Sequence, residues 1–257
     1  MCVLALAWRA HPRWQLVVAG NRDEYHSRPA APLARWNDRP DLIAGRDLQS
    51  GGTWLGVSER GRLVVVTNLR GFGLPEDGRP SRGALVTDLL RGSDPVAVEI
   101  EAYNPVNLIA IDSDQALFLA NRPEPIRIPL DKGLYGLSNG ALDAPWPKTL
   151  RLKSILRDWC MDPANHPEAL LDGLREELLP DIGLDPVAPS DVPQEPNHSP
   201  IFIRDPIYGT RCSSVVAIDR NGQGLFIERR FTPAGQIAGE TRLAFSWPVQ
   251  QTESAGA

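Results

Sequence analysis

Two runs of apolar, β-forming residues predict that the chain begins with a β-hairpin. Residues 2–8 and 14–20 are both rich in β-forming residues, and the intervening segment 9–13 has the composition of a turn. A second hairpin is predicted over 52–57 and 62–68, with its turn at residues 59–61. The proline-rich stretch between the two hairpins is interpreted as a connection without strands; its prolines are Pro29, Pro32 and Pro40.

Helical spacing of apolar residues follows in three segments. The first opens at Ser81 and runs through Leu90, and the second begins at Pro147, where a helix's first turn tolerates proline. The third covers about 167–179. The remaining apolar runs predict strands at 107–111, 116–120, 134–137, 213–219 and 224–230.

The order of strands, then helices, then strands favours an α+β protein with antiparallel sheets covered by helices. The first strand must then pair with late ones, so we expect a single domain over 1–249. Residues 180–200 hold six prolines and are interpreted as a long surface loop. Residues 250–257 are expected to form a flexible C-terminal tail.

Composition and charge exclude several classes of function. The 257 residues are 42% hydrophobic and carry a formal net charge of −5, which fits a globular protein and argues against a general nucleic-acid surface. Cys2, Cys160 and Cys212 lie too far apart for a disulfide framework or a zinc site. No stretch is long enough to span a membrane and no signal peptide is visible, so a cytoplasmic protein is expected.

Cys2 is the first candidate for chemistry because it precedes the first strand. A small residue at position 2 allows removal of the initiator Met1, and the new N-terminus would carry a thiol and a free α-amine on one residue. That amine can act as base for its own side chain, so nucleophile and base need no histidine. The alternative is that Cys2 is a small hydrophobic residue that opens a buried strand.

Polar residues directly follow the second predicted strand. In an antiparallel hairpin, Asn21, Arg22 and Asp23 arrive beside Cys2. A guanidinium near the sulfur stabilises a thiolate, and a carboxylate near the α-amine orients it. The alternative is a turn with a surface ion pair, which contributes little to stability.

Four more residues are candidates, each with a plain structural alternative. Asn68 and Asn139 follow strands and are candidate oxyanion donors, although asparagine is also a common turn residue. Arg211 is a candidate for binding a substrate carboxylate or phosphate, or else forms a structural ion pair. Trp54 either packs in the core or lines a pocket.

Several motifs together resemble the NRDE family, named after Asn-Arg-Asp-Glu, which includes the transport-and-Golgi-organisation protein 2 homologues. The motifs that carry the resemblance are Met1-Cys2, 21–24, 51–57, 67–68, 81–83, 103–108, 136–140, 145–148 and 208–213. The resemblance implies a four-layer αββα sandwich like that of N-terminal-nucleophile hydrolases, similar to the cysteine amidases that include penicillin V acylase and bile-salt hydrolase. It also implies, position by position, a site made of Cys2, Arg22, Asp23, Asn68 and Asn139.

Two functions follow as expectations. The first is an amidohydrolase that cleaves an amide or related acyl bond of a small-molecule substrate with Cys2, without a required cofactor or metal. The second is a non-enzymatic protein on the same fold that carries haem, acyl-CoA or another hydrophobic anion, since family members have been linked to haem trafficking and lipid metabolism. A purely structural role is the weakest interpretation. The sequence sets neither the substrate nor the oligomeric state.

Overall fold

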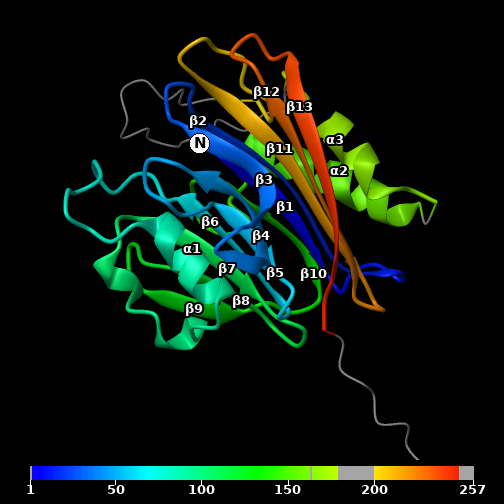
Figure 1. Cartoon of the computed structure of the whole chain (residues 1–257), viewed down its shortest axis with the longest axis horizontal. Coiled ribbons are helices and arrows are strands. Elements are labelled where there is room, and N and C mark those ends of the chain that lie inside the picture. The colour runs from blue at the N-terminus through cyan, green and yellow to red at the C-terminus, as the bar shows by residue number, and fades with distance from the viewer. Residues whose placement is uncertain (1, 163, 179–199, 249–257) are drawn as a thin grey trace, which may run out of the picture.

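Two antiparallel sheets form the centre of the protein. The computed structural model describes residues 2–162, 164–178 and 200–248 (Figure 1). The six-stranded sheet has the order β10 (Gly133–Leu137), β1 (Val3–Trp8), β2 (Trp14–Tyr25), β11 (Tyr208–Asp219), β12 (Gln223–Phe231), β13 (Ile237–Ser246). The seven-stranded sheet has the order β3 (Ala30–Trp36), β4 (Arg39–Asp47), β5 (Leu55–Ser58), β6 (Arg62–Asn68), β7 (Val106–Ile111), β8 (Ala116–Ala120), β9 (Ile126–Pro129).

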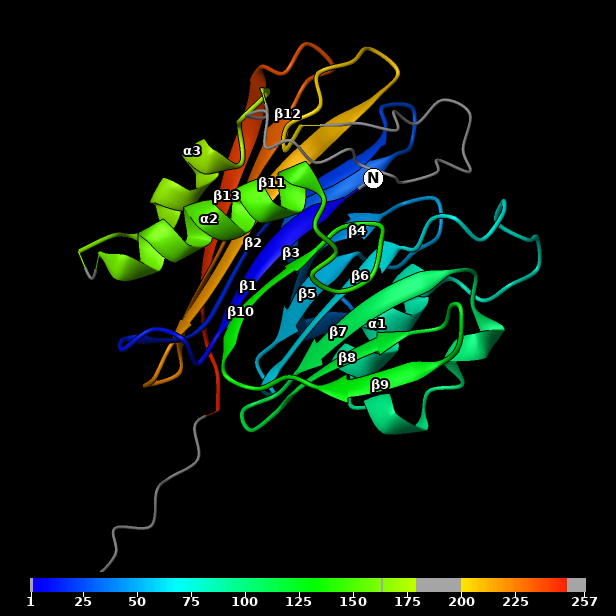
Figure 2. The same cartoon turned by 180° about the vertical axis from the view of Figure 1, so that it is seen from behind.

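Helices cover the outer faces of both sheets, as the two opposite views show (Figures 1 and 2). Helix α1 (Arg82–Leu90) packs on β5 and β6, and α2 (Pro147–Met161) packs on β1 and β10. Helix α3 (Leu170–Gly173) contacts α2 and β11. Short 3-10 turns lie at η1 (Pro95–Ala97), η2 (Ile100–Ala102) and η3 (Pro167–Ala169). The layers are therefore helix, sheet, sheet, helix, which confirms the four-layer αββα sandwich.

Strands buried on both faces explain why β1 is apolar throughout. Its even positions, such as Leu4 and Leu6, lie in the core between the two sheets, together with Val18 of β2. Its odd positions, such as Val3 and Ala5, lie in a second core under α2. A third core packs α1 against the outer face of the seven-stranded sheet. Because successive side chains of a strand point to opposite faces, each strand serves two cores.

The first hairpin is confirmed, and its register places the polar end of β2 beside the chain start. Leu4 pairs with Gly20, and Val3 pairs with Asn21. A Cβ atom on Gly20 would lie 2.8 Å from the Leu4 Cβ, so this close approach requires glycine. Strand β2 also continues to Tyr25, beyond the expected end at residue 20. It runs on because β11 pairs with it as far as Tyr25.

The proline-rich connection was a wrong prediction, because strands β3 and β4 occupy it. Strand β3 is an edge strand whose register shifts between Ala31 and Ala34, and Pro32 sits in that irregularity, where a missing N–H is tolerated. The edge strands β9 and β13 were also missed, because most of their residues are exposed and give a weak apolar pattern.

Other predicted boundaries change by a few residues. Strand β5 begins at Leu55, three residues after the predicted start of the second hairpin. The third predicted helix is shorter than expected, because α3 ends at Gly173 instead of 179. Glycine is a poor helix former, and Gly173 is packed so closely on Ile155 that a Cβ would come within 2.6 Å of it. The predicted loop at 180–199 and the predicted tail at 250–257 lie outside the described residues.

Candidate active site

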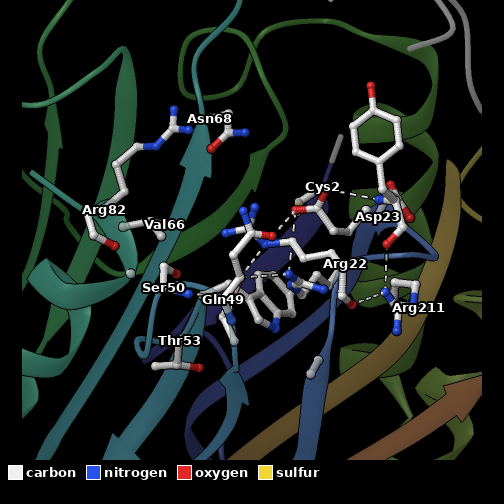
Figure 3. A pocket seen from close by; sticks show the side chains of 18 of the residues that line it. Cys2, Arg22, Asp23, Gln49, Ser50, Thr53, Val66, Asn68, Arg82 and Arg211 are labelled. Carbon is white, nitrogen blue, oxygen red and sulfur yellow. Dashed lines mark hydrogen bonds and ion pairs between the residues drawn. The ribbon is translucent and has the colours of Figure 1, made fainter. Parts of the chain in front are cut away.

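Cys2 lies directly before β1, at the end of the sheet where β2 carries its polar residues. Its side chain is half-buried and its sulfur accepts a hydrogen bond from the backbone N–H of Asp23 (Figure 3). Its backbone carbonyl accepts a 2.7 Å hydrogen bond from the Ser138 hydroxyl. The residue is therefore held between β2 on one side and β10 on the other.

The sheet register brings several predicted site residues into one row across four strands. Continuing the Val3–Asn21 and Leu4–Leu137 pairings by one and two residues places Cys2 opposite Arg22 and opposite Asn139. Arg22 pairs with Cys212 on its other side. Neighbouring strands are about 4.8 Å apart, and cross-strand partners point to the same face. Asn139, Cys2, Arg22 and Cys212 thus share the face that looks toward the other sheet.

Arg22 belongs to a group of charges that joins the two sheets. Its Nη2 lies 3.3 Å from Asp47 Oδ2 on β4 and 3.5 Å from Glu24 Oε2. Arg28 approaches the same Asp47 oxygen at 2.5 Å. Burial alone would raise the pKa of Asp47. The hydrogen bonds from Arg28 and the Ser50 N–H, with both arginine charges, outweigh it and hold that pKa below the usual value.

Asp23 and Asn21 point to the opposite face of the sheet from Arg22. Asp23 Oδ1 accepts a 2.6 Å hydrogen bond from Thr210, while its backbone N–H binds the Cys2 sulfur. Asn21 is fully buried and donates to the carbonyls of Leu174 and Ile201, 2.8 Å each. Arg22 therefore shares the Cys2 face and Asn21 lies behind the sheet, whereas Asp23 contacts the Cys2 sulfur through its backbone N–H and also lines the cavity.

The two asparagines are joined to each other at the edge of the site. Asn139 is buried, and its Nδ2 donates 2.7 Å to the backbone carbonyl of Asn68 at the end of β6. An amide nitrogen carries two hydrogens, so this bond leaves Asn139 one further donor. Both residues line the cavity described next, and their assignment as oxyanion donors stays a prediction.

A cavity of about 990 Å³ opens above Cys2, between the ends of the two sheets (Figure 3). Its volume is at the upper end of small-molecule sites. Eight arginines line it, which are Arg22, Arg28, Arg46, Arg70, Arg79, Arg82, Arg211 and Arg230. Its other walls include Trp54, Val66, Tyr208 and Phe231, so charged and apolar surfaces alternate around the sulfur.

Trp54 and Arg211 both lie on the cavity wall, and each also has a structural contact. Trp54 packs partly against the core between the sheets. Arg211 Nη1 donates to the carbonyls of Tyr25 and Arg28, at 2.7 and 2.9 Å. This guanidinium therefore fixes the backbone that carries Arg28, and its expected contact with a substrate anion stays a prediction.

The Cys2 thiol has a pKa above its usual 9.0, and burial is the main cause. The charged amino terminus, the Asp23 N–H bond and the Arg22 charge act in the opposite direction, whereas the Asp23 carboxylate raises the pKa further. Arg22 thus favours the thiolate as expected, but burial outweighs it. A sulfur of this kind needs a nearby base at neutral pH.

Three residues of the site were missed from sequence. Asp47 pairs with Arg22, Glu228 is buried beside Cys212 with a raised pKa, and Arg82 lines the wall at the start of α1. Asp47 precedes a tight turn in which its Oδ1 accepts the N–H groups of Gln49 and Ser50. The segment Asp-Leu-Gln-Ser-Gly-Gly is a turn signal, but nothing in the sequence joins its Asp to Arg22.

The described part of the chain offers neither a metal-ligand cluster nor a membrane-spanning helix. Among residues 2–162, 164–178 and 200–248, no three His, Cys, Asp or Glu side chains lie where they could hold a metal ion together. No helix in the described part of the chain combines the length and apolarity needed to cross a bilayer.

Known structures share this architecture. The chain matches a Caenorhabditis elegans N-acylethanolamine-hydrolyzing acid amidase ortholog with a TM-score of 0.50, 11% identity and coverage of 83% of this chain and 92% of that one. It matches conjugated bile acid hydrolase from Clostridium perfringens with a TM-score of 0.52, 8% identity and coverage of 98% and 100%. At these identities the match shows a common fold, that of N-terminal-nucleophile hydrolases.

Sequence comparison gives the family. The human Transport and Golgi organization protein 2 homolog is 33% identical over 269 residues, covering 94% of this chain and 97% of the human protein. The Drosophila melanogaster Transport and Golgi organization protein 2 is 25% identical, covering 90% and 93%. The family model "Transport and Golgi organisation 2" matches residues 1–233. These matches extend over nearly the whole sandwich, and the chain belongs to the Transport and Golgi organisation 2 family, as its NRDE motif indicated.

Proposed function

We propose that this protein is an N-terminal-nucleophile hydrolase that cleaves an amide or related acyl bond with Cys2. One observation carries the proposal: the Cys2 sulfur faces a cavity of about 990 Å³ and lies in one cross-strand row with Arg22 and Asn139. The fold shared with two amide-hydrolysing proteins supports it. The activity named for those proteins belongs to them, and for this chain it is our inference.

The reaction begins after removal of Met1. The α-amine of Cys2 takes the thiol proton, and the sulfur attacks the carbonyl carbon to give a tetrahedral oxyanion. The second N–H of Asn139, with Asn68 at the cavity edge, is the candidate donor to that oxyanion. The C–N bond breaks, the ammonium proton passes to the leaving amine, and a thioester remains on Cys2.

Water completes the cycle. The α-amine takes a proton from water, the resulting hydroxide attacks the thioester, and the acid product leaves as the sulfur regains its proton. Arg22 stabilises negative charge on the sulfur, and Asp23 orients the amine from behind the sheet. No step requires a cofactor.

The first test has two parts. Intact mass spectrometry of the purified protein should show that Met1 is absent. Reaction with p-nitrophenyl acetate should then release p-nitrophenolate in a burst and leave an acetyl group on Cys2, found by peptide mapping. Cys160→Ala and Cys212→Ala should keep the burst, and Cys2→Ala should lose it. Retained Met1, or acetyl groups on the other cysteines alone, would contradict the proposal.

A second candidate function is a carrier of haem, acyl-CoA or another hydrophobic anion. The observation that favours it is the mixture of arginines and apolar side chains around the cavity. Among the described residues of the cavity wall there is no histidine, so Cys2 and Cys212 supply the sulfur ligands for haem. Haem titration followed by absorbance, with Cys2→Ala as the variant, tests this function. Binding that survives both cysteine substitutions would exclude thiolate coordination.

A further inference from the structure

Arg82 is the first residue of α1 and lies on the cavity wall across from Cys2. Figure 3 shows it beside Asn68, on the other side of the view from Cys2, Arg22 and Asp23. Its Nη1 donates 2.9 Å to the backbone carbonyl of Pro105, which fixes the direction of the side chain. It forms no ion pair with any carboxylate of the described residues.

Most other arginines of the cavity face a carboxylate. The pairs are Arg22–Asp47, Arg28–Asp47, Arg46–Asp38, Arg79–Glu76 and Arg230–Glu228. In each pair, a carboxylate of the protein itself balances the charge of the arginine. Arg82 and Arg211 differ from these, because their partners in the described structure are neutral backbone carbonyls; Arg211 donates to two of them and Arg82 to one.

The electrostatic surroundings of Arg82 favour the binding of an anion. Burial and the nearby positive charge of Arg70 lower the pKa of Arg82 to about 10, with a smaller effect from Arg28. Glu24 and the Cys2 sulfur act in the opposite direction, which also places Arg82 within electrostatic reach of the nucleophile. The first turn of α1 contains no acidic residue, so the positive end of the helix dipole adds to the same region.

We propose that Arg82 binds an anionic group, a carboxylate or a phosphate, on the compound whose acyl carbon Cys2 attacks. The inference rests on the proposed function for the role of Cys2. A guanidinium suits both groups, because its N–H donors match two oxygens of a carboxylate or phosphate. The substrate class is then an anionic amide or acyl compound that spans the cavity from Cys2 to α1.

Two alkylating reagents of nearly equal size test the charge requirement. 6-(Iodoacetamido)hexanoate carries a carboxylate at the far end of its chain and N-hexyl-iodoacetamide is its neutral counterpart; with both, the Cys2 sulfur displaces iodide and forms a thioether. The measured quantity is the ratio of their rate constants at Cys2, at fixed pH and ionic strength. This ratio cancels any effect of a substitution on the thiolate itself.

Arg82→Gln should lower the ratio of the anionic to the neutral reagent about tenfold, as expected for loss of one hydrogen bond to a charged group. Arg79→Gln is the matched control, because Arg79 lines the same cavity but is paired with Glu76. Its ratio should stay within about twofold of the parent protein. Equal ratios for Arg82→Gln and the parent would overturn the inference.

A second measurement is independent of the nucleophile. In Cys2→Ala, phosphate or succinate at constant ionic strength should raise the unfolding temperature, and adding Arg82→Gln should abolish that rise. The anion that stabilises more strongly identifies phosphate or carboxylate as the preferred group. Labelling of Cys2 by neither reagent would contradict the proposed function alone. No stabilisation by either anion would overturn the anion site.

Discussion

The Ser138 hydroxyl holds the backbone of Cys2 through its 2.7 Å hydrogen bond to the Cys2 carbonyl. The Ser138 carbonyl in turn accepts a 2.6 Å bond from Thr67 of β6, in the other sheet. Asn107 of β7 supports this link by donating to Thr67 and to the Gly140 carbonyl. Cys2 is therefore positioned by both sheets, although the strand it precedes belongs to one.

Ser138→Ala should slow acetylation of Cys2 by p-nitrophenyl acetate about tenfold, because small displacements of a reacting atom have large effects on rate. The free energy of unfolding should fall by about 1 kcal/mol. Burst kinetics and urea denaturation measure the two effects. Ser246→Ala, at an exposed position of β13, is the control and should change neither. An unchanged burst rate in Ser138→Ala would contradict the positioning role.

Asn21→Ala should destabilise the fold by about 2–4 kcal/mol, because two buried carbonyls lose their donors and Ser213 loses its 2.6 Å acceptor. Denaturant unfolding measures this change. In the fraction that remains folded, p-nitrophenyl acetate should still acetylate Cys2, because Asn21 faces the helix layer. Asn221→Ala, in an exposed turn, should stay within about 0.5 kcal/mol. A loss below that value for Asn21→Ala would mean that another group replaces its hydrogen bonds.

Asp47→Asn should lower stability at neutral pH by about 1 kcal/mol or more, because the partner charge of Arg22 and Arg28 is lost while the turn acceptor remains. The folded pKa of Asp47 lies below 3.8, so its contribution is present above that pH and is lost as pH falls through the folded value. The gap between variant and parent in urea unfolding should therefore narrow below about pH 3.8. If the difference in unfolding free energy between Asp47→Asn and the parent did not depend on pH, the charge of Asp47 would not be the cause of the lost stability.

Arg22→Gln should raise the pKa of the Cys2 thiol further, because it removes a positive charge that favours the thiolate. Below pH 9, alkylation by iodoacetamide should slow roughly three- to tenfold and its inflection should move to higher pH. Arg157→Gln on the exposed face of α2 is the control. An inflection at the same pH in parent and Arg22→Gln would show that the guanidinium does not act on the sulfur.

The hairpin and its polar end could be predicted because both depend on local pattern. Two apolar β-forming runs separated by a turn predicted β1 and β2, and antiparallel pairing then brought Arg22 beside Cys2. The facing of Asn21 and Asp23 follows from the same two-residue period: positions 21 and 23 share a face with Val17, which packs under the helices. Closeness along the chain alone, without that period, places all three residues on one side.

The rest of the site depends on contacts between distant segments. Asp47 reaches Arg22 only because the two sheets stack, and Arg82 reaches the cavity only because α1 begins at its rim. Strands such as β13 escape prediction for a different reason, because an edge strand with exposed side chains has little apolar surface to reveal its period.

The row through Asn139, Cys2, Arg22 and Cys212 has a consequence for biosynthesis. The thiol leaves the ribosome first, but Cys212 of β11, which pairs with Arg22, is made only after more than two hundred further residues. Pairing at such sequence separation is slow, because the entropy of loop closure is lost before the stabilising contacts form. The Cys2 thiol is therefore without the β11 side of the cavity throughout most of translation, and a truncated product that stops before β11 would keep it more exposed.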